Sequence, residues 1–160
     1  MKKLVVLGSA LLIAVTGTVF TASAQDMTPE QAAAAAVDTR KAVFKVLRTN
    51  LGPIAGMARG APFDAEVAER NARRIAAVAS MIPEVLTHDT RGFSNFETTA
   101  LDIIWENQDD FAAKAQALMD NANAFADVAA GGDMAATLGA FRQLGGSCGN
   151  CHDTYRVDND

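Results

Sequence analysis

Two cysteines and a histidine stand close together near the end of this 160-residue chain. Cys148 and Cys151 are three positions apart, and His152 follows the second cysteine directly. In this pattern each thiol can add across one vinyl group of a haem, while the imidazole ligates the iron. The chain has two cysteines in total, so this chemistry would consume both thiols. The motif therefore predicts one covalently bound haem c with His152 as an axial ligand of the iron.

A zinc site and a redox-active dithiol are the alternatives for two cysteines with this spacing. A structural zinc ion needs about four protein ligands, and the only other histidine, His88, lies far away in the sequence. A thioredoxin-like dithiol belongs to a βαβ unit, and no strand pattern accompanies the motif. Covalent haem is therefore the better interpretation.

The first 24 residues have the pattern of a secretory signal peptide. Lys2 and Lys3 precede an uncharged apolar run over residues 4–20, and Ala22-Ser23-Ala24 supplies a cleavage site. An uncleaved membrane anchor is the alternative, but this run is short for a span of about 20 residues. We expect cleavage before Gln25, a mature domain of residues 25–160, and export to the bacterial periplasm, where the haem is attached.

The mature domain is acidic. Lys2 and Lys3 are the only charged residues of the leader, so the remainder has 12 basic residues against 19 acidic ones and a formal charge of −7. Nucleic acids and anionic lipids bind basic surfaces. We therefore expect neither as a partner, and no membrane association after cleavage. The acidic charge permits a basic redox partner protein but does not require one.

Apolar residues recur with helical spacing, and no segment alternates as a strand does. The first predicted helix runs from its cap Thr28 to residue 51 or slightly beyond, where Gly52-Pro53 should end or kink it. The second begins after the cap Asp64 and closes at Pro83. The third spans about 99–130, and the fourth follows its cap Asp133 into the haem motif. With a long connection over residues 84–98, the predicted class is an all-α, antiparallel four-helix bundle.

Each predicted helix has one apolar face. On the fourth helix, the two cysteines and the histidine fall at positions i, i+3 and i+4, on one side of the helix. The expected core faces are Val37, Phe44 and Leu51; Val67, Ile75, Val78 and Ile82; Leu101, Ile104, Phe111, Ala115, Leu118 and Phe125; and Met134, Leu138, Phe141 and Leu144.

The C-terminal segment CGNCHDTYR, residues 148–156, resembles the C-x-x-C-H-x-x-[FY]-R motif of the cytochrome c′ family, the class II c-type cytochromes. Arg40-Lys41, the GAPFD segment at residues 60–64, and Ile104-Trp105 also resemble family patterns. The resemblance implies a four-helix bundle with haem near the last helix. It also implies a homodimer formed through the first two helices, where the Ala32–Ala36 run would permit close approach.

The resemblance also concerns the sixth coordination position of the iron. In low-spin relatives, a methionine four residues after the first-helix arginine ligates the iron, and here that position holds Phe44. A phenyl ring has no lone pair to donate, so we expect a five-coordinate, high-spin iron. Methionine at helical spacing is usually core, and a loop histidine usually faces solvent. The rival ligands set aside on these grounds are Met27, Met57, Met81, Met119, Met134 and His88.

Two arginines are candidates for the haem surroundings. Arg40 lies on the apolar seam, where an unpaired charge would be costly; the resemblance implies a haem propionate as its partner, and snorkelling to solvent is the alternative. Arg156, one turn after His152, is expected beside the imidazole or near a propionate, or else as a solvated arginine that favours the helix dipole. Trp105 is expected to pack near the haem edge or the second-helix core.

Two functions fit these residues. The first is a periplasmic carrier of one electron. The second is a protein that binds or scavenges a small diatomic gas, chiefly nitric oxide, which binds iron strongly without a polar distal group. We do not predict an enzyme, because no carboxylate pair, nucleophile–base set or distal acid–base residue accompanies the motif.

Overall fold

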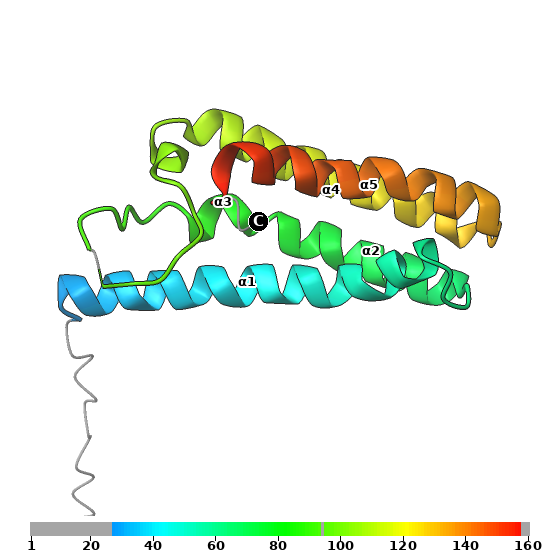
Figure 1. Ribbon diagram of the computed structural model, residues 1–160, viewed down its shortest axis with the longest axis horizontal. Coiled ribbons are helices and arrows are strands. Elements are labelled where there is room, and N and C mark those ends of the chain that lie inside the picture. Colours follow the sequence, from blue (N-terminus) through cyan, green and yellow to red (C-terminus); the bar gives the residue numbers. More distant parts are fainter. Residues whose placement is uncertain (1–26, 94, 158–160) are drawn as a thin grey trace, which may run out of the picture.

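The computed structural model describes residues 27–93 and 95–157, and the segments with regular structure within these ranges are helical. The predicted signal peptide, residues 1–24, and the expected mature start at Gln25 lie outside them. The elements are α1 (Pro29–Ala58), α2 (Ala65–Ala79), the short α3 (Ile82–Val85), the 3₁₀ helix η1 (Asp102–Trp105), α4 (Gln108–Ala130) and α5 (Met134–Tyr155). Figure 1 shows α1, α2, α4 and α5 lying side by side along one elongated axis. The predicted four-helix bundle is confirmed.

The predicted helix starts are confirmed at three capping residues. Thr28 forms a capping box with Gln31, in which each side-chain oxygen accepts a hydrogen bond from the backbone N–H of the other residue. The Asp64 Oδ1 atom accepts a hydrogen bond of 2.9 Å from the Val67 N–H at the start of α2. Asp133 caps α5 by accepting a 2.7 Å bond from the N–H of Ala136. These side chains satisfy N–H groups that have no partner inside the helix.

Gly52-Pro53 was predicted to end or kink the first helix, and it does not end it, because α1 continues through Pro53 to Ala58. Proline removes one backbone hydrogen bond from a helix interior. Here Ile54 and Met57, in the turn that follows, are buried in the core. Tertiary packing therefore maintains the last turn despite the missing bond.

Two other boundaries differ from the prediction. The second helix stops at Ala79, and Pro83 lies in the first turn of the separate helix α3 rather than closing α2. The third helix begins at Gln108 instead of about residue 99. Residues 99–101 are extended because they form backbone hydrogen bonds with the end of α5. Local apolar spacing could not reveal this tertiary pairing.

The core is concentrated between α2 and α4, which pack closely along their lengths. Their buried faces are rich in alanine, including Ala72 and Ala76 on α2 and Ala122 and Ala126 on α4. Small side chains let two helix axes approach each other. Of the predicted core residues, Met134 is 54% exposed and Phe44 is 38% exposed, so neither is buried in this core.

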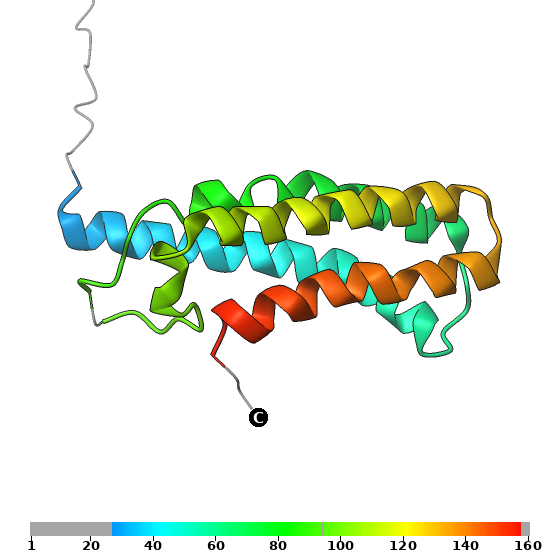
Figure 2. The same cartoon turned by 90° about the horizontal axis from the view of Figure 1, so that it is seen from above.

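α5 is held mainly by α4 and contacts α1 and η1 less. In the view of Figure 2, the ribbons of α5 and α1 cross at an angle. None of the helices in the described part of the chain is long and apolar enough to span a bilayer.

Candidate haem-binding site

A cavity of about 720 Å³ lies between α1, α4, α5 and the segment that precedes η1. This volume is within the range of about 300–1,000 Å³ that is typical of sites for small molecules and cofactors. Its walls are mainly apolar, with Val37, Leu47, Ile75 and Leu118 among the residues that line it. All six candidate site residues also line it, namely Arg40, Phe44, Cys148, Cys151, His152 and Arg156.

The motif residues lie on the part of α5 that faces this cavity. Cys148, Cys151 and His152 are each half-buried. Burial raises the pKa of both thiols, so neither is activated as a thiolate. Burial, together with the charge of Arg156, lowers the pKa of His152 and favours the neutral imidazole. A neutral imidazole is the form that can donate a lone pair to iron.

The described residues do not favour the zinc alternative. They contain no group of three or more His, Cys, Asp or Glu side chains that could hold a metal ion. An apolar cavity with two protonated thiols on one helix and an imidazole beside them suits a flat, largely apolar macrocycle that is attached through sulfur. The residues present therefore fit a haem c.

Tyr155 holds the end of α5 in place. Its side chain is buried, its hydroxyl donates a hydrogen bond of 2.6 Å to the Asp110 Oδ2 atom, and its ring meets Phe111 edge to face at 5.2 Å. Its carbonyl accepts a 3.0 Å bond from the Leu101 N–H, and the Val157 N–H donates to the Thr99 carbonyl at 2.8 Å. These bonds fix the last turn of α5, which carries His152, against α4 and the connection before η1.

The Tyr155 hydroxyl makes the free energy of unfolding depend on pH in the alkaline range. Burial, followed by the bond to Asp110, raises the pKa of Tyr155 from its ordinary value of 10.0 to about 12. The folded state therefore retains this proton where the unfolded chain has lost it, and the free energy of unfolding falls as the pH rises from about 10 to 12. We expect Tyr155→Phe to lower stability by about 1 kcal/mol at neutral pH and to reduce this alkaline decline.

Denaturant titrations of both holoproteins, followed by circular dichroism from about pH 8 to about pH 12, would measure how the free energy of unfolding changes with pH. Other alkaline transitions are common to both proteins, so the difference between the two curves isolates the hydroxyl. Parallel curves for wild type and Tyr155→Phe would contradict the assignment.

Two side chains of α4 bind the motif segment of α5. Lys114 donates a 3.0 Å hydrogen bond to the Asn150 Oδ1 atom, between the two cysteines. Asn121 donates a 2.7 Å bond to the hydroxyl of Ser147, directly before Cys148. Neither contact, nor the bond between Asp110 and Tyr155, was predictable from the sequence. Helical spacing assigns the α4 residues to polar positions but does not identify the facing residues on α5.

Arg40 is buried and anchors the loop after α3. Its Nε atom donates to the Val85 carbonyl at 2.9 Å, its Nη1 to the Thr90 hydroxyl at 2.8 Å, and its Nη2 to the carbonyl of His88. The guanidinium lies 5.1 Å from the ring centroid of Trp105. Burial lowers the pKa of Arg40, and the negative charge of Asp89 partly opposes this effect. A guanidinium has five N–H donors, so two remain for a haem propionate.

Trp105 lies next to Arg40. Its indole N–H donates a 2.9 Å hydrogen bond to the carbonyl of Leu86, and Arg91 lies 5.9 Å from its ring centroid. Leu86 and Ile104 line the cavity, whereas Trp105 is absent from its wall. The tryptophan therefore supports the loop after α3 rather than forming the cavity surface.

The distal candidate Phe44 lies on the cavity-facing side of α1. Val37, Phe44 and Leu51 line the cavity at intervals of seven residues, as the sequence analysis expected for one seam. Of the rival ligands, Met57 is buried, and Met27, Met81 and Met134 are exposed. Neither His88 nor any methionine of the described residues lines the cavity. His88 contributes its backbone carbonyl to Arg40, and its side chain is exposed.

Comparison with known proteins gives one consistent family. A family model described as Cytochrome C′ matches residues 35–156, a segment that contains all six candidate residues. A cytochrome c-554 from Cereibacter sphaeroides is 40% identical over 122 residues, which are 75% of this chain and 79% of the relative. A cytochrome c′ from the same organism is 33% identical over 128 residues, covering 76% and 82% of the two chains.

Solved structures share the fold. The cytochrome c′ from Shewanella frigidimarina superposes with a TM-score of 0.69 at 35% identity, over 79% of this chain and 97% of that one. A nitric oxide complex of a variant cytochrome c′ from Alcaligenes xylosoxidans gives 0.66 at 26% identity, over 79% and 97%. A cytochrome c′ with ligand-controlled dimer dissociation gives 0.70 at 27% identity, over 83% and 99%.

Proposed function

Because this chain belongs to the cytochrome c′ family, whose members are haem c proteins, we propose that it is a periplasmic carrier of one electron. Cys148 and Cys151 would attach the haem, and His152 would ligate its iron. The bound haem supplies an iron centre that accepts and releases one electron. The observation that carries the proposal is that six residues from α1 and α5 line one apolar cavity of cofactor size.

The chain's own residues would hold this centre rigid. The Tyr155 bonds and the Lys114–Asn150 bond fix the α5 segment that carries the motif. Arg40 fixes the loop after α3 and offers its remaining donors to a propionate. A rigid wall favours one-electron exchange because the surroundings of the iron move little between its two oxidation states.

A second function, nitric oxide binding or scavenging, is supported by a separate observation. No methionine or imidazole other than His152 lines the cavity among the described residues, and Phe44 does. A haem held in this cavity would meet apolar side chains rather than a second protein ligand, and its iron would then be able to take up nitric oxide. A related protein has been solved as a nitric oxide complex. We include this ligand in the proposal, with a homodimer as the assembly, since another relative has a ligand-controlled dimer.

The proposal can be tested with the purified holoprotein, produced in a host that attaches haem to c-type cytochromes. We expect absorption and resonance Raman spectra of a high-spin, five-coordinate iron that change when nitric oxide is added to the reduced protein. A low-spin spectrum of the methionine-ligated type would eliminate gas binding and leave electron transfer alone. A colourless, exported protein whose two thiols react with an alkylating reagent would contradict both functions.

A further inference from the structure

The charge around the cavity is opposite to the charge of the whole domain. Five of the residues that line it are lysine or arginine, namely Arg40, Lys41, Arg48, Lys114 and Arg156, and a single one, Glu97, is acidic. The mature domain, by contrast, has 12 basic residues and 19 acidic ones. A large share of the basic residues is therefore gathered at one site.

Three of these cations are available at the surface. Lys41, Arg48 and Arg156 are exposed, and none of them forms an ion pair with a carboxylate of the described residues. Lys114 differs, because its Nζ atom lies 3.9 Å from the Asp110 Oδ2 atom. Arg40 also differs, because it is buried and donates to neutral oxygens. We name the exposed three residues the basic rim.

The cavity lining as a whole stays positive when a haem is bound. Two propionates add two negative charges, and Arg40 is expected to meet one of them. When Glu97, Asp110 and both propionates are set against the five cations, a positive excess remains. Local charge at the mouth of a cleft attracts an approaching ion or protein more effectively than distant charge, which salt screens within about 10 Å at 0.1 M.

We propose that the basic rim is the docking surface for an acidic protein partner, through which the haem exchanges its electron. This inference rests on the proposed electron-carrier function. It reverses the expectation from net charge, which allowed a basic partner. The partner's recognition element would be a cluster of carboxylates next to its own redox centre.

The salt dependence of the oxidation rate shows whether the local charge of the basic rim or the net charge of the domain governs the encounter with an anion. Hexacyanoferrate(III), a trianion, oxidises the reduced holoprotein by accepting one electron, and the haem iron(II) becomes iron(III). If the basic rim governs encounter, the second-order rate constant falls as ionic strength rises. If the net negative charge governs encounter, the rate constant rises, because salt then screens a repulsion. A rise for the wild-type protein would overturn the proposal.

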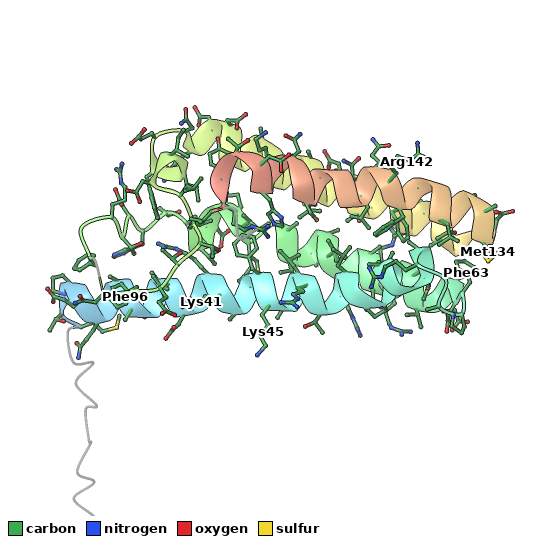
Figure 3. All side chains as sticks on the ribbon, in the orientation of Figure 1. Lys41, Lys45, Phe63, Phe96, Met134 and Arg142 are labelled. Atoms are coloured by element: carbon green, nitrogen blue, oxygen red, sulfur yellow. The ribbon has the colours of Figure 1, made fainter. Side chains whose placement is uncertain are left out.

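Two matched charge-reversal variants test whether the basic rim causes this salt dependence. Lys41→Glu with Arg48→Glu should slow oxidation about tenfold at low salt and invert the salt dependence. The control, Lys45→Glu with Arg142→Glu, changes the net charge by the same amount outside the cavity lining. Figure 3 shows Lys45 and Arg142 extending away from the bundle on opposite sides. Equal rate constants for the two variants would overturn the proposal.

A binding measurement separates a protein-like partner from small anions. In calorimetric titrations of the oxidised holoprotein, poly-L-glutamate should bind the wild type and the control variant. It should not bind Lys41→Glu/Arg48→Glu, whereas Lys41→Arg/Arg48→Lys should retain binding. Binding of hexacyanoferrate without binding of poly-L-glutamate would overturn the assignment of a protein partner. Absorption spectra confirm haem content in every variant, so a failure of the proposed function itself would be recognised separately.

Discussion

The double variant Cys148→Ala/Cys151→Ala is expected to contain no covalently attached haem, where the wild-type protein is fully loaded. Each thioether bond needs a thiol from the chain, and these are the only two cysteines present. Denaturing electrophoresis with haem staining measures the attached fraction directly. His152 remains in this variant, so any haem that still associates would be released when the protein is denatured.

The same variant is expected to be less stable as well as colourless. It leaves the cavity of about 720 Å³ without its haem, so the apolar walls lose the packing contacts that the haem would supply. A typical domain is stabilised by only about 5–15 kcal/mol, so a loss of several kcal/mol would lower the midpoint of thermal unfolding markedly. Circular dichroism during thermal unfolding would measure this change.

A control variant within the motif distinguishes attachment from general disturbance. Asn150 lies between the two cysteines, is exposed, and accepts the hydrogen bond from Lys114. We expect Asn150→Ala to retain covalent haem and to lose about 1 kcal/mol of stability or less. Haem that survives denaturation of the double-cysteine variant would contradict the attachment chemistry.

Phe44→Met is expected to convert the proposed high-spin iron to a low-spin, six-coordinate one. Phe44 lines the cavity from α1, four residues after Arg40. The family resemblance implies that low-spin relatives have a methionine ligand at this position. A thioether sulfur has the lone pair that a phenyl ring lacks. Absorption and resonance Raman spectra would report the change, and nitric oxide uptake should slow because the sixth position is then occupied.

Val46→Met is the matched control for this change. Val46 lies on the same helix, is 45% exposed and does not line the cavity. It should therefore leave the spin state unchanged. If Phe44→Met also leaves the spin state unchanged, Phe44 does not lie over the iron.

The residues that make the site were predictable because their chemistry is encoded locally. The three motif residues share one helix face through their spacing alone. Arg40 and Phe44 came from their register on the first helix together with the family resemblance. All of them line one cavity in the structure. Three capping residues were likewise predictable, because a cap depends on a few adjacent positions.

Features that depend on partners distant in the sequence were not predictable. The extended segment at residues 99–101 has apolar residues at helical spacing, yet its backbone pairs with residues 155–157. Pro53 predicted a helix end, but the burial of Ile54 and Met57 overrides that local preference. Arg40 was expected to meet a propionate, and the structure adds three oxygens, one at the end of α3 and two in the loop after it, forty-five or more positions along the chain.

The uneven packing of the four helices affects the fate of a chain that receives no haem. α2 and α4 close on each other through small side chains, whereas α1 and α5 are held apart by a space that the polypeptide does not fill. A chain that never receives its prosthetic group would keep α1 packed on α2 and α5 packed on α4, but the faces of α1 and α5 that line the cavity would lack a partner. Segments that open locally are the ones that proteases cut first. We therefore expect limited proteolysis to cut the haem-free chain faster than the holoprotein.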